Sequence, residues 1–209
     1  MTVSRDALVL FDVDTQVDFM CQTGKLYVHG AENIVPKLAV LTNWARANDI
    51  PVISTADAHR LEDPEFSLWP PHCVIGTPGQ RLIPETQFPC PTVIPSRPGA
   101  FVPPDRWLGQ FILEKPSYTP EDNPNFSALL ESLRLRRVVV FGVATEYCVR
   151  AVVLALRRRG FDVDVVTDAI KSITEQGGCN ALTEMAAAGS RMVTVARICG
   201  YAVSDAQAG

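Results

Sequence analysis

The chain has 209 residues, of which 47% are hydrophobic and 20% are charged, and its formal net charge is -4. These values are ordinary for a soluble globular protein and predict a single domain over residues 1–209 with a substantial core. They give no reason to expect nucleic acid or a membrane as a partner, because there is no basic excess and no apolar stretch long enough to span a bilayer.

The first residues and the cysteines predict a cytoplasmic location. The opening sequence Met-Thr-Val-Ser-Arg-Asp has no apolar segment of the kind found in a signal peptide. The six cysteines are scattered along the chain, with no Cys-x-x-Cys pair. Without an export signal, we expect reduced thiols rather than a disulfide framework.

The first predicted strand covers residues 7–11 and leads directly into a group of carboxylates. Asp12, Asp14 and Asp18 follow the apolar run. Carboxylates just past a core strand are costly unless they are solvated, paired or used, and strand alternation puts Asp12 and Asp14 on one face. They could serve the chemistry or simply cap the next turn. An amphipathic helix is predicted over residues 31–48.

The second predicted strand, residues 51–55, is followed by candidate metal ligands. Asp57 and His59 occupy alternate positions and therefore point to one side of an extended segment. His72 lies downstream as a distant third ligand, and Glu65 offers a further oxygen. Such a set would suit a catalytic divalent ion with positions left open for water or substrate. The alternative is that both histidines are ordinary surface residues.

A long loop or small excursion is expected at about residues 60–108. Its part from 74 to 108 is rich in proline and glycine, but interleaved apolar residues favour an ordered loop. A short strand at residues 111–113 then ends close to Lys115. A lysine there is usually solvated, but beside a thiolate and a carboxylate it could hold both as anions. A helix is predicted over residues 123–135.

A valine-rich run that begins at Val138 is typical of a buried parallel strand. A strong helical pattern follows and stops at three arginines and Gly160. Cys148 therefore lies in the first turn of a helix that leaves the carboxyl end of a strand. A helix N-terminus lowers the pKa of a thiol and offers N–H groups to an anion. The alternative is a small buried apolar residue, as most free cysteines are.

The remaining chain continues the alternation of strands and helices. A strand is predicted at residues 161–166, a helix at 181–188 and a last strand at 191–196. This order is typical of an α/β fold with a mostly parallel sheet flanked by helices. Such sheets bind ligands at the carboxyl ends of their strands, where Asp14, Lys115 and Cys148 are all expected.

Three segments resemble the nicotinamidase/isochorismatase-like superfamily of cysteine hydrolases. They are Asp14-Thr-Gln-Val-Asp18-Phe19, Lys115 after a strand, and Gly142-Val-Ala-Thr-Glu-Tyr-Cys148-Val, and they occur in the family's order. The last is the most specific. A narrower likeness, to the metal-binding signature of the nicotinamidases within that superfamily, lies in Asp57-Ala-His59 and Trp69-Pro-Pro-His72-Cys73-Val74.

The resemblance implies a three-layer Rossmann-like fold and a catalytic set. Asp14 would be the general base and acid, Lys115 its ionic partner and Cys148 the nucleophile. The peptide between Val143 and Ala144 would be cis, with the N–H groups of Ala144 and Cys148 forming an oxyanion hole.

The resemblance also implies a cofactor and a substrate. Asp57, His59 and His72 would hold a divalent ion, with zinc favoured, and Glu65 could fill the position of a further ligand. Phe19 and Trp69 match positions that pack against an aromatic substrate ring. The family's habit further implies a homo-oligomer.

Three hypotheses follow. The leading one is deamidation of nicotinamide to nicotinate and ammonia through a cysteine thioester, with the metal anchoring the pyridine ring. The second is a related hydrolase acting on another small amide, carbamoyl or ureido compound. The third belongs to a different class, a non-catalytic binding protein on the same fold, in which Cys148 would be unreactive.

Overall fold

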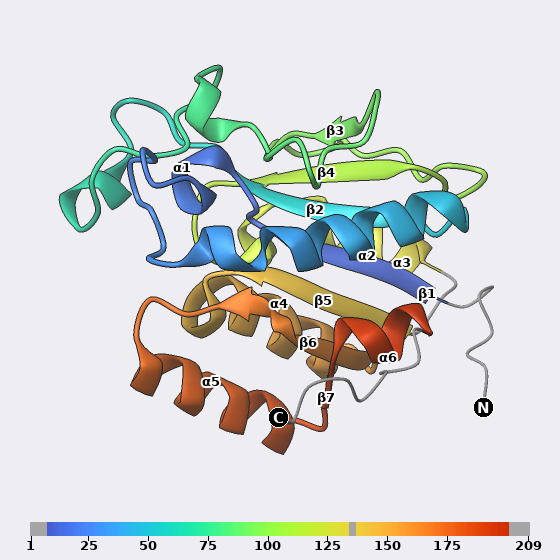
Figure 1. Cartoon of the computed structure of the whole chain (residues 1–209). Helices are drawn as coiled ribbons and strands as arrows, with labels where there is room; N and C mark the ends of the chain where they lie inside the picture. Colours follow the sequence, from blue (N-terminus) through green and yellow to red (C-terminus); the bar gives the residue numbers. More distant parts are fainter. Residues whose placement is uncertain (1–7, 134–136, 201–209) are drawn as a thin grey trace.

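A computed structural model describes residues 8–133 and 137–200 of the chain (Figure 1). Within these residues, one seven-stranded sheet has the strand order β3-β4-β2-β1-β5-β6-β7, and each neighbouring pair is parallel. The predicted α/β fold is therefore confirmed. The strands are β1 (Leu8–Val13), β2 (Val52–Asp57), β3 (Thr92–Ile94), β4 (Gln110–Lys115), β5 (Arg137–Val143), β6 (Asp162–Lys171) and β7 (Arg191–Val193).

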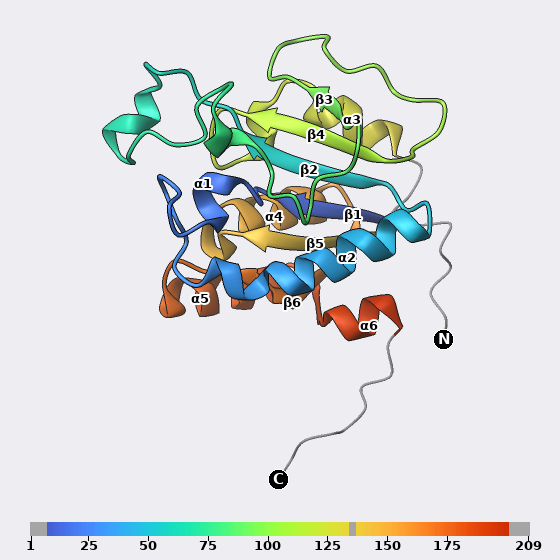
Figure 2. The ribbon, with the colours of Figure 1, turned by 45° about the horizontal axis from the view of Figure 1, so that its top comes forward.

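Helices cover both faces of the sheet and complete a three-layer arrangement (Figures 1 and 2). One face packs against α1 (Val17–Met20), α2 (Val35–Ala47) and α6 (Val195–Cys199). The other packs against α3 (Phe126–Ser132), α4 (Arg150–Arg158) and α5 (Glu175–Ala187). Each face has its own apolar cluster, because the buried strands carry apolar side chains on both sides.

Short turns of helix complete the list of elements. Four are 3-10 turns, namely η2 (Ala31–Ile34), η3 (Pro64–Ser67), η4 (Pro78–Gln80) and η5 (Pro120–Asp122). A π-helical turn, η6 (Thr145–Val149), leads from β5 into α4. No helix among residues 8–133 and 137–200 is both long and apolar enough to cross a membrane.

Several predicted boundaries differ from those of the structure. The excursion at 60–108 contributes β3, a strand too short to show a pattern in the sequence. The helix predicted at 31–48 begins with η2, and the one predicted at 181–188 begins earlier, at Glu175, behind its N-cap Thr174. The end of the expected helix 123–135 and the start of the expected strand 7–11 lie outside the described residues.

The central strands β1 and β5 approach each other closely at their carboxyl ends. Gly142 has φ 119°, and a Cβ there would lie 2.1 Å from the carbonyl oxygen of Val13. Only glycine fits this position, because any side chain would overlap the neighbouring backbone. The close approach brings the residues that follow β1 and β5 to one point of the sheet edge.

Candidate active site and metal centre

The carboxyl ends of β1, β4 and β5 bring three of the predicted residues together. Lys115 Nζ lies 2.8 Å from Asp14 Oδ2 and 3.7 Å from Cys148 Sγ. All three side chains are buried. The sequence placed each residue at a strand end, and parallel strands carry these ends to the same edge.

The ammonium group of Lys115 also pairs with Asp57, which the sequence did not predict. In addition, Lys115 Nζ donates a hydrogen bond of 3.0 Å to the carbonyl oxygen of Ser117. Asp57 and Lys115 are register partners of β2 and β4, so their side chains project from adjacent strands. One buried cation thus connects the carboxylate beside the thiol with a carboxylate of the proposed metal site.

Asp14 lies just past the end of β1, at φ 50°. Its Oδ1 accepts a hydrogen bond of 2.6 Å from the hydroxyl of Thr55. Burial raises the pKa of the Asp14 carboxyl and Asp57 adds to this, while Lys115 opposes the rise. A carboxyl with a raised pKa accepts a proton near neutral pH more readily than an ordinary aspartate.

Cys148 lies in η6, directly after the carboxyl end of β5. Burial raises the pKa of its thiol well above the ordinary value, the Asp14 carboxylate adds to the rise, and Lys115 opposes it. The lowered thiol pKa expected from a helix N-terminus is therefore wrong for this site, because burial and the neighbouring Asp14 carboxylate both disfavour the thiolate. The cis peptide between Val143 and Ala144 is present.

Asp12 and Asp14 do not share a face, contrary to the prediction. Asp12 Oδ2 accepts hydrogen bonds from the hydroxyls of Ser54 at 2.9 Å and Thr15 at 3.0 Å. Asp14 bonds instead to Thr55, whose side chain points to the opposite side of β2 from Ser54. The alternation stops at Asp14 because its left-handed backbone ends the strand.

Asp12 is not solvated. Its side chain is 1% exposed and its Oδ1 has no hydrogen-bond partner among the described residues. Burial raises its pKa to about 7, the hydroxyls of Ser54 and Thr15 lower it, and Asp14 raises it further. This carboxyl belongs to a buried polar network that continues through Ser54 to Gln110.

The predicted metal ligands converge at the end of β2. Ligand atoms of Asp57, His59 and His72 lie within 4.8 Å of one another, and all three residues are buried. The Nε2 atoms of both histidines lie 3.7 Å from Asp57 Oδ2. Burial opposes ionisation of Asp57, but Lys115 and the two imidazoles outweigh it and hold its pKa well below the usual range.

The hydrogen bonds around both histidines fit a metal centre. His59 Nδ1 lies 3.1 Å from Asp63 Oδ2, and His72 Nδ1 lies 2.8 Å from the carbonyl oxygen of Pro70. Both rings thereby direct Nε2 inward, and His59 Nε2 is buried without a hydrogen-bond partner in the described part of the chain. Metal-bound histidines are commonly oriented by such outer partners, and two imidazoles with a carboxylate suit zinc.

Glu65 lies in η3, beside the three converging ligands. One ligand atom from each of His59, Asp63 and Glu65 lies within 4.8 Å of the other two, so these residues form a second group. Asp63 Oδ1 accepts the backbone N–H of Glu65 at 3.0 Å, which fixes the start of η3. Glu65 also lines the pocket described next, and within the described residues it groups with His59 and Asp63 rather than with Asp57 and His72.

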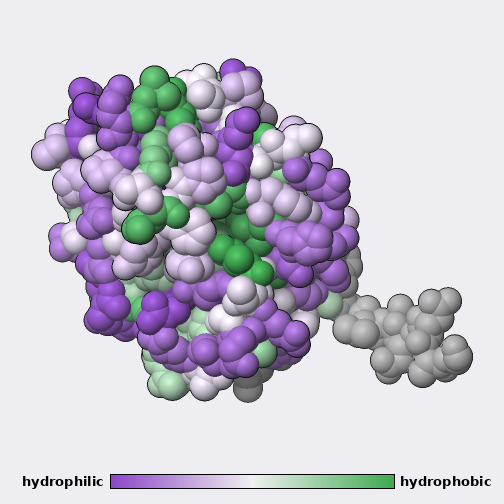
Figure 3. All heavy atoms as spheres, turned by 90° about the vertical axis from the view of Figure 1, so that its left-hand side faces the viewer, coloured by the Kyte–Doolittle hydropathy of each residue, from purple (hydrophilic) through white to green (hydrophobic). Residues whose placement is uncertain are grey.

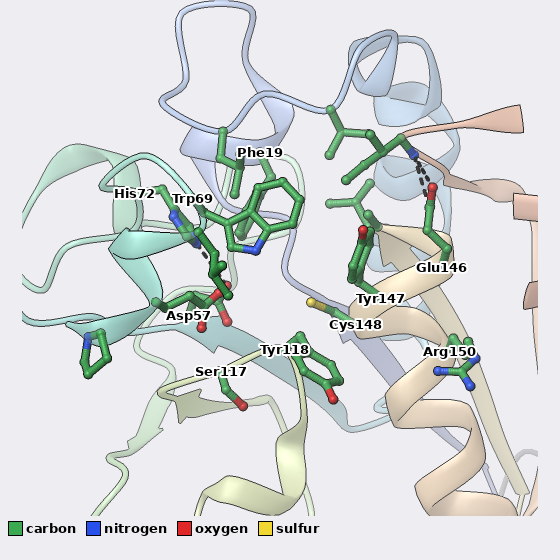
Figure 4. A pocket seen from close by; sticks show the side chains of 18 residues that line it. Phe19, Asp57, Trp69, His72, Ser117, Tyr118, Glu146, Tyr147, Cys148 and Arg150 are labelled. Carbon is green, nitrogen blue, oxygen red and sulfur yellow. Dashed lines mark hydrogen bonds and ion pairs between the residues drawn. The ribbon is translucent and has the colours of Figure 1, made fainter. Parts of the chain in front are cut away.

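A continuous pocket of about 850 Å³ joins the thiol to the candidate metal centre (Figure 4). Phe19 and Trp69, predicted to contact a substrate ring, both line it, as do Ala144 and Cys148. The ring of Phe19 lies 5.4 Å from that of His72, centroid to centroid. Asp14, Lys115 and His59 do not line the pocket and lie behind the residues that do.

Gln16 and Asp18, which lie in the segment from Asp14 to Phe19, make contacts that the sequence did not predict. Gln16 Oε1 accepts the backbone N–H of Asp57 at 2.7 Å, and its Nε2 donates to the Asp57 carbonyl oxygen at 2.8 Å. Asp18 Oδ2 accepts the N–H of Cys73 at 2.7 Å, next to His72. Both residues belong to a segment that resembles the family, which was a signal that they matter. Their partners could not be predicted, because they lie more than 40 positions away along the chain.

The pocket wall also contains two tyrosines that were not predicted. Tyr147 precedes the thiol and contacts Trp69 edge to face, with ring centroids 5.8 Å apart. Tyr118 reaches the pocket from the loop after β4. Tyr147 stood beside Cys148 in the sequence, yet nothing there indicated which way its ring would point.

Comparisons with known proteins agree with this geometry. The family model "Isochorismatase domain" matches residues 6–197. The nicotinamidase of Escherichia coli (strain K12) is 28% identical over 206 residues, covering 88% of this chain and 93% of that protein. The nicotinamidase/pyrazinamidase of Mycobacterium tuberculosis (strain ATCC 25618 / H37Rv) is 30% identical over 201 residues, covering 88% of this chain and 97% of that protein.

A solved structure is similar over nearly its whole length. The pyrazinamidase of Pyrococcus horikoshii in complex with zinc has a TM-score of 0.75 and 28% sequence identity. The match covers 90% of this chain and 99% of that one. The likeness therefore extends over most of the fold of this chain.

Proposed function

The chain belongs to the isochorismatase family of hydrolases, and on this premise we propose that it hydrolyses nicotinamide to nicotinate and ammonia through a thioester on Cys148. The observation that carries the proposal is the pocket that joins Cys148 to His72 and Asp57. A pyridine carboxamide has two matching features, a carbonyl carbon for a thiol and a ring nitrogen for a metal centre. The nicotinamidases among the relatives support the same amide.

The first chemical step is proton transfer coupled to attack. The buried thiol of Cys148 is neutral at rest because its pKa is raised. Asp14 takes its proton as the sulfur attacks the carboxamide carbon, which forms the C–S bond and moves the carbonyl π electrons onto oxygen. The N–H groups of Ala144 and Cys148 donate to this oxyanion.

The second step expels ammonia. The oxyanion collapses, the C–N bond breaks, and the proton held by Asp14 passes to the leaving nitrogen. This leaves an acyl group on Cys148 as a thioester. Lys115 holds Asp14 in place through the ion pair of 2.8 Å and balances its charge once the proton has left.

Water then completes the reaction. Asp14 removes a proton from a water molecule, whose oxygen attacks the thioester carbonyl. The C–S bond breaks, and the sulfur recovers a proton from Asp14 as nicotinate leaves. The same carboxyl therefore acts in both halves, which is consistent with its single buried position beside the thiol.

Asp57, His59 and His72 would hold a divalent metal, with zinc favoured by two imidazoles and a carboxylate. When bound, the ion would supply a Lewis acid for the ring nitrogen of the substrate. Glu65 offers a further oxygen ligand on the pocket side. Phe19 and Trp69 provide apolar walls for the ring.

The test is ammonia release from nicotinamide by the purified protein, before and after metal stripping, with Cys148→Ala as the inactive control. We expect activity to be lost on stripping and restored by zinc. If nicotinamide releases no ammonia although Cys148 is alkylated at high pH, the choice of amide is wrong, and carbamoyl and ureido compounds become the candidates. An unreactive Cys148 would instead support the non-catalytic hypothesis.

A further inference from the structure

The pocket continues well beyond the groups that the proposed reaction uses. Its volume of about 850 Å³ lies near the upper end of the roughly 300–1,000 Å³ that hold drug-sized ligands, whereas nicotinamide is a single ring with one carboxamide. The outer part, here called the outer pocket, is lined by Leu26, Leu68, Tyr118, Tyr147 and Ile173. These side chains are apolar or aromatic.

The outer pocket presents an apolar surface to solvent. Leu68 is 82% exposed, Tyr118 53%, Ile173 43% and Tyr147 40%. Figure 3 views the side that carries the carboxyl ends of the strands, and hydrophobic surface gathers there in a hollow between hydrophilic borders. Exposed apolar side chains gathered around one opening are typical of a ligand-binding site.

The charged side chains at this end of the pocket already have partners. Arg150 donates to both carboxylate oxygens of Glu184, at 2.6 and 2.7 Å. Glu146 accepts the backbone N–H group of Ile173 at 3.1 Å (Figure 4) and that of Thr174 at 2.9 Å. The outer pocket therefore offers no unpaired cation that would attract a charged group among its described lining side chains.

We propose that the outer pocket binds an uncharged apolar substituent of the substrate, so that the substrate class is pyridine carboxamides with an aliphatic or aromatic group on the ring. This inference rests on the proposed function and extends it. It assigns a role to Leu68, Tyr118 and Ile173, which the proposed chemistry does not need.

The chemistry of the ring predicts where the substituent is attached. In nicotinamide one ring carbon lies between the ring nitrogen and the carbon that bears the carboxamide. When the nitrogen faces His72 and the carboxamide faces Cys148, this carbon faces the pocket floor. The ring carbon opposite to it, which carries the 5-substituent, then faces the outer pocket. A group at that position can extend outward without disturbing either contact.

The kinetic test compares nicotinamide with its 5-methyl, 5-phenyl and 5-carboxy derivatives. The 5-phenyl derivative should saturate the enzyme at a concentration roughly tenfold lower than nicotinamide does, the order expected from burying one apolar ring. The 5-carboxy derivative should be the poorest substrate, because no unpaired cation among the described lining residues meets its charge. If nicotinamide is hydrolysed but the 5-phenyl derivative reacts more than tenfold less efficiently, this inference fails and the proposed function stands.

A binding measurement separates the outer pocket from catalysis. Calorimetry with the Cys148→Ala protein should show that the 5-phenyl derivative binds more tightly than nicotinamide, by the same roughly tenfold factor. Equal affinities would overturn the inference. If neither amide binds or is hydrolysed, the proposed function itself fails, so the two failures are distinguishable.

Matched surface variants locate the effect. Leu68→Asp and Ile173→Asp each place a carboxylate in the outer pocket, and both should reduce the catalytic preference for the 5-phenyl derivative over nicotinamide by about tenfold. Val102→Asp is the control, because Val102 is 81% exposed, like Leu68, but does not line the pocket. A preference that all three variants leave unchanged would exclude these walls as the binding surface.

Discussion

The side chain of Gln16 forms two hydrogen bonds with the backbone of Asp57. Gln16 Oε1 accepts from the N–H of Asp57 at 2.7 Å, and Gln16 Nε2 donates to its carbonyl oxygen at 2.8 Å. The same Nε2 donates to the carbonyl oxygen of Gln80 at 2.7 Å. The side chain therefore fixes the end of β2, from which Asp57 projects towards both Lys115 and the two histidines.

Gln16→Ala should lower both stability and metal affinity. The substitution leaves buried backbone groups of Asp57 unpaired, and each such group costs about 1–3 kcal/mol. We expect a loss of about 2–5 kcal/mol in the free energy of unfolding, measured by urea denaturation, and weaker zinc binding by calorimetry. Gln87→Ala is the control, because the side-chain hydrogen bond of Gln87 to the Phe88 carbonyl is a long contact of 3.5 Å. Equal effects in the two variants would contradict the positioning role of Gln16.

Lys115→Met should lower the free energy of unfolding by more than the loss of one ordinary ion pair would. It leaves the buried carboxylates of Asp14 and Asp57 without their common cation, and breaking a buried pair costs about 3–5 kcal/mol. We also expect kcat to fall by roughly 10² or more, because Asp14 loses the partner that holds it beside the thiol.

The control for that variant is Lys37→Met. Lys37 pairs with Asp168 at 3.3 Å, but its side chain is 49% exposed, so its loss should cost about 0–1 kcal/mol and leave kcat unchanged. Denaturation and nicotinamide turnover measure the two quantities. A Lys115→Met protein as stable and active as Lys37→Met would show that the shared ammonium is dispensable.

Asp12→Asn should stabilise the protein at alkaline pH. Burial raises the pKa of Asp12 from 3.8 to about 7, so the folded state holds a proton that the unfolded state releases over this range. The destabilisation of the wild-type protein by the buried, ionised Asp12 carboxylate is absent below about pH 3.8. It grows as the pH rises and is complete above about pH 7. At about 1.4 kcal/mol per pKa unit, it reaches at most about 4 kcal/mol.

The measurement is urea denaturation of both proteins at two pH values, about 5 and about 8, on either side of the folded-state pKa. The stability of Asp12→Asn relative to the wild type should rise by about 2 kcal/mol or more between these values. Asp105→Asn, which removes a carboxyl group at an exposed position, is the control. A difference that stays constant with pH would mean that Asp12 titrates at the same pH in the folded and unfolded states.

His72→Ala should reduce metal binding and weaken the apparent affinity for nicotinamide more than it lowers kcat. The variant removes one of the two Nε2 atoms that face Asp57 Oδ2 at 3.7 Å, while the thiol and Asp14 remain. Zinc content after dialysis and the KM for nicotinamide measure the effect. His29→Ala is the control, since His29 is exposed and is the one histidine of the chain's three that lies outside the predicted metal site. An unchanged KM would exclude anchoring of the substrate by the metal.

Local sequence patterns were enough to predict the alternation of strands and helices, except for the short strand β3, and the sheet edge at which the chemistry lies. Apolar runs such as the one from Val138 are buried on both faces, which forces parallel strands with helical crossovers. Parallel strands collect their carboxyl ends at one edge, so Asp14, Lys115 and Cys148 were all expected at that edge, and the strand order of the sheet then brought them close together. The spacing of Asp57 and His59 followed from strand periodicity in the same way.

Contacts that depend on the pairing of distant segments could not be predicted from any local pattern and are seen first in the folded molecule. The ion pair of Lys115 with Asp57 follows from the register of β4 against β2, which no local pattern encodes. The side chains of Asp14 and Asp12 lie on different faces because the backbone of Asp14 is left-handed at the end of the strand. The raised pKa of Cys148 likewise depends on burial beside Asp14, and burial is a property of the packed molecule rather than of the helix that carries the thiol.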